Sequence, residues 1–158
     1  MRIEGEFTFD GPREEVWELL HDPDVLARAL PGTETLERVG ENVYAGEMRV
    51  GVGPFTAGSY DVEVRLEEQV PPERYTMIVD GRGSLGFARG KAEVELEEEG
   101  SNRTRMRYAS DLQVGGKVAG VGQRLLDSVG RGMTKQGLEA LNEELRARLE
   151  GGPGSGEG

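Results

Sequence analysis

The sequence predicts an α+β domain in which a curved, seven-stranded antiparallel sheet is covered on one face by a long C-terminal helix. Three observations lead to this prediction. Apolar and polar residues alternate over 2–9, they alternate again through most of 33–114, and apolar residues recur at helical spacing over 116–149. A chain of 158 residues is close to the usual size of one domain. We therefore expect a single domain over 1–150, followed by a flexible glycine-rich tail over 151–158.

The N-terminal part predicts one strand and two short helices. Residues 2–9 alternate between apolar and polar side chains, as a half-buried strand does. Pro12 stands at the first position of a helix whose first turn carries acidic residues. A second helix is expected to begin with Asp22 as its N-cap and Pro23 at its first position. Pro31 is expected to end it.

The segment from 33 to 114 predicts six further strands. Its period-two runs are separated by short stretches rich in glycine and proline, which are typical of turns. Short connections join antiparallel neighbours, so these strands are expected to form a meander. One face of such a sheet stays bare unless the last helix covers it. The turns fall at residues 40–41, 51–54, 71–72, 81–83 and 100–102.

The composition excludes several classes of function. The chain contains no cysteine, which excludes disulfides, thiolate metal sites and cysteine nucleophiles. Its net charge of −11 argues against general nucleic-acid binding, which needs clustered lysine and arginine. No apolar run approaches the roughly 20 residues of a membrane span, and we find no leader of basic and apolar residues. We therefore expect a cytoplasmic protein that is neither exported nor inserted into a membrane.

The predicted long helix begins with many glycines, because residues 115–137 contain seven of them. Each glycine inside a helix costs about 1 kcal/mol relative to alanine, so this segment has low intrinsic helix stability. At about 100° per residue, Gly115, Gly122, Gly130 and Gly137 fall within about 80° of one another. They share or adjoin the apolar side of the helix with Val118, Leu125, Leu126, Val129 and Met133.

Two explanations of these glycines remain open. The missing side chains let the helix approach the sheet closely, or they leave space for an apolar ligand. The strand over 86–96 also carries small residues on one side, whereas packed cores usually match large side chains with small ones. Tyrosine hydroxyl groups among the inward-facing residues would orient the polar part of a ligand. The candidate cavity-lining residues are Leu26, Leu30, Tyr44, Met48, Tyr60, Met77, Gly86, Ala88, Gly90, Met106, Tyr108, Leu112, Gly122, Leu125, Leu126, Val129, Gly130 and Met133.

Four segments carry a resemblance to a known family: GEFTFDGPREEVWELLHDPDVLARALPG, VGVGPF, GFARGKAEVEL and VGGKVAGVGQRLLD. In this order they resemble the carbon monoxide dehydrogenase G-subunit (CoxG) family of the START/Bet v 1-like (SRPBCC) superfamily, over residues 2–149. The resemblance implies the helix-grip fold, in which the long C-terminal helix clasps a curved sheet around a hydrophobic cavity. It therefore favours a cavity over close packing.

The same resemblance implies an accessory protein rather than a catalyst. Members of the family are linked to assembling carbon monoxide dehydrogenase or recruiting it to the cytoplasmic membrane. They often carry a longer C-terminal extension implicated in membrane contact, whereas this chain ends in eight glycine-rich, acidic residues. We therefore expect non-catalytic binding of a lipid- or quinone-like molecule, without a cofactor or metal, in support of a carbon monoxide dehydrogenase-type enzyme.

Two other functions remain open. A pure adaptor would bind partner proteins without any ligand. A polyketide cyclase- or dehydratase-like enzyme, such as the superfamily also contains, would use polar groups that line the cavity. The alternation of the strands predicts that the two charged candidates for such a role point outward. The candidates are Tyr44, Tyr60 and Tyr108, with Asp61 or Arg89 if these turn inward.

Two short motifs are interpreted as structural. Residues 81–86 match the pattern G-x-G-x-x-G, but a strand rather than a helix follows, so we expect a hairpin turn. His21 is the only histidine and lies beside Asp22 and Asp24. Three ligands so close together around a proline give poor metal geometry, so we expect His21 at the surface between the two short helices.

A basic face on the predicted long helix consists of Lys117, Arg124, Arg131 and Lys135. Such a face is usually solvated. It is also a candidate docking surface for anionic lipid headgroups at the inner face of the cytoplasmic membrane, or for an acidic partner.

The leucines after Gly137 do not continue the earlier apolar stripe. They are rotated from it by roughly 100°, so either the helix bends at Gly137 or its last three turns carry an exposed leucine stripe. We expect the exposed stripe, which a partner chain, a membrane or a second copy of the chain in a homodimer would cover. The stripe consists of Leu138, Leu141, Leu145 and Leu149.

Overall fold

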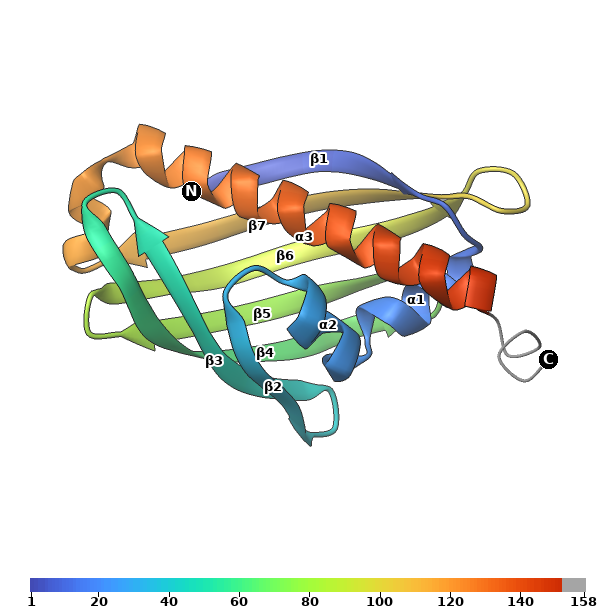
Figure 1. The fold of residues 1–158 in the computed structure, drawn as a ribbon, viewed down its shortest axis with the longest axis horizontal. Helices are drawn as coiled ribbons and strands as arrows, with labels where there is room; N and C mark the ends of the chain where they lie inside the picture. Colours follow the sequence, from blue (N-terminus) through green and yellow to red (C-terminus); the bar gives the residue numbers. More distant parts are fainter. Residues whose placement is uncertain (152–158) are drawn as a thin grey trace.

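The computed structural model describes residues 1–151, apart from the side chains of residues 55–57. A seven-stranded antiparallel sheet carries three α-helices on one face (Figure 1). The strand order is β1-β7-β6-β5-β4-β3-β2. The elements are β1 (Arg2–Phe9), α1 (Arg13–Leu20), α2 (Pro23–Ala29), β2 (Thr33–Gly40), β3 (Val43–Val52), β4 (Phe55–Val70), β5 (Arg74–Gly83), β6 (Gly86–Glu98), β7 (Thr104–Gly115), the 3₁₀ helix η1 (Lys117–Val121) and α3 (Gln123–Gly151).

The predicted order of one strand, two short helices, six strands and a long helix is confirmed. Pairing along the chain from β2 to β7 forms the meander, and β1 adds an edge strand to the sheet by pairing with β7. Figure 1 shows α3 crossing the face of the sheet, with α1 and α2 beside its C-terminal half. No helix among residues 1–151 is long and apolar enough to cross a membrane.

The start of the long helix differs from the prediction. The α-helix begins at Gln123 rather than 116, because η1 precedes it. Gly116 and Gly122 border η1 with φ values of 86° and 100°, and such positive φ values favour glycine. Gly115 belongs to β7. The prediction that Gly115 and Gly122 lie on the inner side of the helix is therefore wrong.

The apolar core consists of two clusters. The larger one joins α1, α2 and the C-terminal half of α3 to the sheet, and Phe9, Val16, Leu19 and Leu145 are fully buried in it. The smaller one lies at the other end of the molecule, under η1 and the start of α3. It is formed by Val52, Val118 and Leu126, with half-buried Met1, Val50, Val114, Val121 and Val129 against them.

The expected exposed leucine stripe is wrong. Leu138, Leu141 and Leu145 are 7%, 3% and 0% exposed, and only Leu149, at 40%, is exposed. The apolar side of α3 changes direction along the helix because the helix packs against different elements. Its first half faces the sheet, and its second half also faces α1 and α2 (Figure 1). The helix continues unbroken past Gly137.

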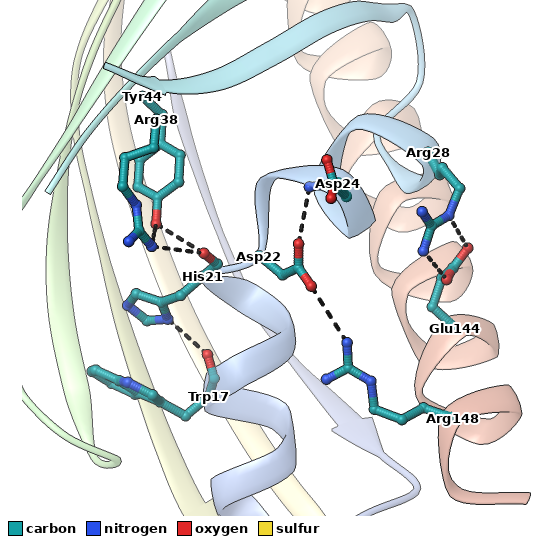
Figure 2. Close-up of polar contacts among 9 residues, drawn as sticks. All are labelled: Trp17, His21, Asp22, Asp24, Arg28, Arg38, Tyr44, Glu144 and Arg148. Atoms are coloured by element: carbon teal, nitrogen blue, oxygen red, sulfur yellow. Dashed lines mark hydrogen bonds and ion pairs between the residues drawn. The ribbon is translucent and has the colours of Figure 1, made fainter. Parts of the chain in front are cut away.

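Polar contacts fix the corner between α1 and α2 to α3 (Figure 2). The Arg28 guanidinium donates two hydrogen bonds to the Glu144 carboxylate, with nitrogen–oxygen distances of 3.0 and 3.3 Å. Arg148 pairs with Asp22 at 3.5 Å, and the other Asp22 carboxylate oxygen caps α2 through the backbone N–H of Asp24. The corner is therefore held from the helix side.

The same corner is held from the sheet by Tyr44 of β3 (Figure 2). The Tyr44 hydroxyl donates to the backbone carbonyl of His21 at 2.9 Å, and Arg38 donates to that hydroxyl at 3.1 Å. His21 is half-buried: its Nδ1 lies 2.7 Å from the Trp17 carbonyl oxygen, and its ring stacks on Trp17.

Two carboxylates, Asp10 and Glu144, form hydrogen bonds between α3 and the rest of the fold. Because of them, we expect the folded state to be less stable in acid. Hydrogen bonds from Asn142 and Arg146 lower the pKa of Asp10, and a hydrogen bond from Arg28 lowers the pKa of Glu144. A carboxylate with a lowered folded-state pKa stabilises the fold at neutral pH and loses that contribution as pH falls through the folded-state value. We expect the free energy of unfolding to fall between about pH 5 and about pH 2.

Urea unfolding at several pH values measures this dependence. The Asp10→Asn variant should show a flatter pH profile than the wild type, whereas Glu98→Gln, at an exposed position of β6, should not. Parallel profiles for Asp10→Asn and the wild type would contradict the assignment.

Candidate functional site: two cavities between the sheet and the helices

Two adjoining cavities lie between the sheet and the helices. The outer cavity has a volume of about 320 Å³ and lies under η1 and the first half of α3. The inner cavity has a volume of about 230 Å³ and lies under α2 and the middle of α3. Met48 and Val62 line both, so the two cavities adjoin at these residues. Together they lie in the size range of small-molecule sites.

The outer cavity is lined by apolar side chains from both layers. Its two aliphatic hydroxyl groups are already used within the protein: Thr134 donates to the Gly130 carbonyl at 2.8 Å, and Ser110 donates to the Ile3 carbonyl at 3.2 Å. The lining consists of Met1, Ile3, Met48, Val50, Val52, Tyr60, Val62, Val79, Gly81, Phe87, Ala88, Ser110, Leu112, Val114, Val118, Leu126, Val129, Gly130, Met133 and Thr134.

The inner cavity is bordered by more deeply buried residues, including Val94 and Leu141, which are 2% and 3% exposed. Tyr75 also lines it, and burial raises the pKa of its phenol, so this tyrosine is neutral at physiological pH. The lining consists of Leu20, Leu26, Leu30, Thr33, Thr35, Leu36, Tyr44, Gly46, Met48, Val62, Val64, Leu66, Tyr75, Met77, Val94, Met106, Leu138 and Leu141.

Within the described part of the chain, no Asp, Glu, Lys, Arg or His side chain lines either cavity. This contrasts with the chain as a whole, of which 31% is charged. Burying an ion without a partner is strongly unfavourable. The two cavities are therefore suited to an uncharged, apolar molecule.

Most of the predicted lining residues border one of the two cavities, and five do not. Gly86 and Gly90 lie against the backbone of β7, and Gly122 is exposed at the end of η1. Leu125 lies near Gly53 of the β3–β4 turn, and the Tyr108 hydroxyl lies over the Cα of Gly5. Those that border a cavity are Leu26, Leu30, Tyr44, Met48, Tyr60, Met77, Ala88, Met106, Leu112, Leu126, Val129, Gly130 and Met133.

Two glycines of α3, Gly130 and Gly137, fit the close-packing explanation. A Cβ at Gly130 would lie 2.5 Å from the Ile3 side chain, and one at Gly137 would lie 3.1 Å from the Leu30 side chain. Both glycines therefore permit close packing, against β1 and the end of α2. Gly122 is exposed, with nothing within 4 Å of a Cβ, so it leaves no internal space. Gly130 also borders the outer cavity, as Gly81 and Ala88 of the sheet do.

Several lining residues were missed, although the sequence contained a signal for some of them. Val50, Val52 and Val62 share the alternation that identified Met48 and Tyr60 as inward-facing. Met1 had no such signal, because its position depends on the N-terminal amine, which donates to the Leu112 carbonyl at 2.6 Å.

The residues considered for catalysis are not brought together. The Tyr44 hydroxyl is used at the helix corner, Tyr60 lines the outer cavity, and Tyr108 lines neither cavity. Asp61 and Arg89 are exposed on the sheet face away from the helices, as their alternation predicted. No group of three or more metal-binding side chains occurs among the described residues.

The motif at residues 81–86 forms the β5–β6 hairpin, as predicted. Its first glycines end β5, and β6 begins at Gly86.

The predicted basic face is exposed. Arg124, Arg131 and Lys135 lie on α3, and Lys117 lies on η1. None of the four takes part in an ion pair within residues 1–151. The opposite side of the same helical segment lines the outer cavity.

A family comparison matches nearly the whole domain. The profile described as the carbon monoxide dehydrogenase G-subunit (CoxG) matches residues 5–146. No curated protein matches the chain.

Solved structures of the same architecture support the fold assignment. A conserved protein from Geobacillus kaustophilus has a TM-score of 0.89 at 29% identity, over 94% of this chain and 97% of that one. The Zhui aromatase/cyclase from Streptomyces sp. R1128 has a TM-score of 0.71 at 20% identity, over 94% and 95%. A START superfamily protein from Mycobacterium smegmatis has a TM-score of 0.70 at 8% identity, over 92% and 97%. The predicted START-like helix-grip fold is therefore confirmed.

Proposed function

Because the chain belongs to the carbon monoxide dehydrogenase G-subunit (CoxG) family, we propose that it binds an uncharged, lipid- or quinone-like molecule without transforming it. In this proposal the protein acts as an accessory or carrier for a carbon monoxide dehydrogenase-type redox enzyme, in its assembly or in its recruitment to the inner face of the cytoplasmic membrane. The observation that carries the proposal is the pair of adjoining apolar cavities, in whose described linings no charged side chain occurs.

Binding would be driven by burial of the ligand's apolar surface. Each Å² of apolar surface removed from water contributes about 25 cal/mol. Because the Tyr44 hydroxyl is already used at the helix corner, a polar group of the ligand needs another partner. The corner is tied to α3 and β3, so we propose that the ligand enters at the other end, between the β3–β4 turn and η1.

The likeness to an aromatase/cyclase makes an enzyme of that kind the second candidate. Such an enzyme would need a polar reactive group in the cavity. Asp61 and Arg89, the charged residues considered for this role, lie on the opposite face of the sheet, which favours the binding function.

Native mass spectrometry of protein purified from its own host, followed by solvent extraction, tests the proposal. We expect one uncharged apolar molecule for each chain, released when the protein unfolds and recovered chemically unchanged after incubation. A redox enzyme that co-purifies would identify the partner. Protein that is free of small molecules but stably bound to another protein would support the adaptor instead, and conversion of the bound molecule would support an enzyme.

A further inference from the structure

Thr33 is the first residue of β2, shortly after the end of α2, and it lines the inner cavity. Its strand partner is Met48, and directly opposed residues of an antiparallel pair present their side chains on the same face. Met48 lines both cavities. Thr33 therefore lies on the cavity side of the sheet, close to where the two cavities adjoin.

A β-bulge turns Thr33 toward the cavity. Thr33 pairs with Met48, but Thr35 pairs with Glu47, so β2 contains one extra residue between these two pairs. In a regular strand Thr33 and Thr35 would share one face. The extra residue instead places Thr33 on the face of Leu36, which also lines the inner cavity. Bulges commonly redirect a side chain next to a functional site.

The hydroxyl oxygen of Thr33 is buried and has no hydrogen-bond partner among the described residues. Two other hydroxyl groups of residues that line the inner cavity are partnered: the Tyr44 hydroxyl donates to the His21 carbonyl, and the Thr35 hydroxyl accepts from the backbone N–H of Glu47 at 3.2 Å. Native proteins leave few buried polar groups unpaired, and each one requires an explanation.

We infer that Thr33 is a specificity-determining residue of the cavity, whose hydroxyl forms a hydrogen bond with a neutral oxygen of the bound molecule. The inference rests on the proposed binding function. The oxygen belongs to a hydroxyl or carbonyl group rather than to a carboxylate or phosphate, because the described lining of the inner cavity offers no cation. The molecule is thus an uncharged amphiphile with its oxygen in the inner cavity. Its apolar remainder extends past Met48 and Val62 into the outer cavity.

The five methionines of the chain provide the readout, because all of them line the cavities. Met77 and Met106 line only the inner cavity, Met1 and Met133 line only the outer one, and Met48 lines both. Protein labelled with ¹³C at the methionine methyl groups therefore reports in solution NMR which cavity is occupied.

Two probes of nearly equal shape, 2-naphthol and 2-methylnaphthalene, differ by a hydroxyl in place of a methyl group. They are titrated into the wild type, Thr33→Val and Thr33→Ser. In the wild type we expect 2-naphthol to shift the Met77 and Met106 signals. In Thr33→Val the affinity for 2-naphthol should fall about three- to tenfold relative to that for 2-methylnaphthalene, as expected for one lost hydrogen bond. Thr33→Ser should keep the wild-type ratio.

Thr33→Val keeps the branched shape and removes a hydroxyl without a protein partner, so its melting temperature should equal or exceed that of the wild type. An unchanged ratio of the two affinities in Thr33→Val, with Met77 and Met106 still shifting, would overturn the role of Thr33 while leaving the binding function intact. If 2-naphthol shifts only the Met1 and Met133 signals, the inference that the oxygen lies in the inner cavity would be wrong. A wild type in which neither probe shifts any methionine would overturn the binding function and this inference together.

Discussion

Replacing Leu145 with alanine is expected to lower the free energy of unfolding by about 3–5 kcal/mol. Leu145 is 0% exposed in the larger apolar cluster, and its side chain fills the space left by the missing Cβ of Gly11. The substitution removes buried methyl groups and leaves a cavity at a fully buried position of the larger cluster. A loss of this size is a large part of the total stability of a domain, which is about 5–15 kcal/mol. Urea unfolding measures it.

Leu149→Ala is the matched control, one turn further along α3. Leu149 is 40% exposed, so the same chemical change should cost about 1 kcal/mol or less. A larger loss of unfolding free energy in Leu145→Ala than in Leu149→Ala would show that the leucines of α3 are packed rather than exposed as the sequence suggested. Equal small losses would show that the C-terminal half of α3 is not packed in solution.

Replacing Ala88 with phenylalanine is expected to lower the affinity for a bulky apolar molecule by more than about tenfold, which corresponds to about 1.4 kcal/mol. Ala88 lies on β6 and borders the outer cavity, opposite Gly81 and Val114 on the neighbouring strands. A phenyl ring at this position would occupy much of the cavity of about 320 Å³. The uncharged probe N-phenyl-1-naphthylamine, whose fluorescence rises in apolar surroundings, measures the affinity.

Ala45→Phe provides the control on the opposite face of the sheet. Ala45 lies on β3 opposite Glu37 and Glu63, which are exposed. This variant adds the same side chain outside the cavities, so probe binding should stay at the wild-type level. The thermal stability of Ala88→Phe should be maintained, since the ring fills an apolar hollow. Strong probe binding by folded Ala88→Phe would show that the probe does not use the outer cavity.

Local periodicity was sufficient to predict most of the fold. Alternation along β3 to β7 and the turn residues between these strands gave the meander, and the caps at Asp22 and Pro23 gave α2. The same alternation identified Met48, Tyr60, Met77 and Met106 as inward-facing, and all four border a cavity. These features depend on neighbours within one strand or one turn, which the sequence contains directly.

The errors concern features that depend on distant partners. The leucines after Gly137 are buried because α1 and α2 cover them, and helical spacing alone does not say which elements face a helix. Gly122 and Gly130 fall on the same side of the predicted helix, but their roles differ. Gly122 follows the 3₁₀ helix η1, whereas Gly130 packs against Ile3. The inward turn of Thr33 depends on a register shift between β2 and β3, which no pattern within β2 reveals.

The division of the apolar interior into two clusters has a consequence for exchange with solvent. The smaller cluster, around Val118 and Leu126, borders the outer cavity. It lies beside η1, whose two ends are Gly116 and Gly122. Regions with few buried contacts open at a lower free-energy cost than the whole domain does. In the proposed binding function, transient opening at that end would let a ligand enter or leave while Phe9 and Leu145 stay packed. If the chain binds a ligand in this way, the rate of uptake depends on the smaller cluster, whereas resistance to denaturation depends mainly on the larger one.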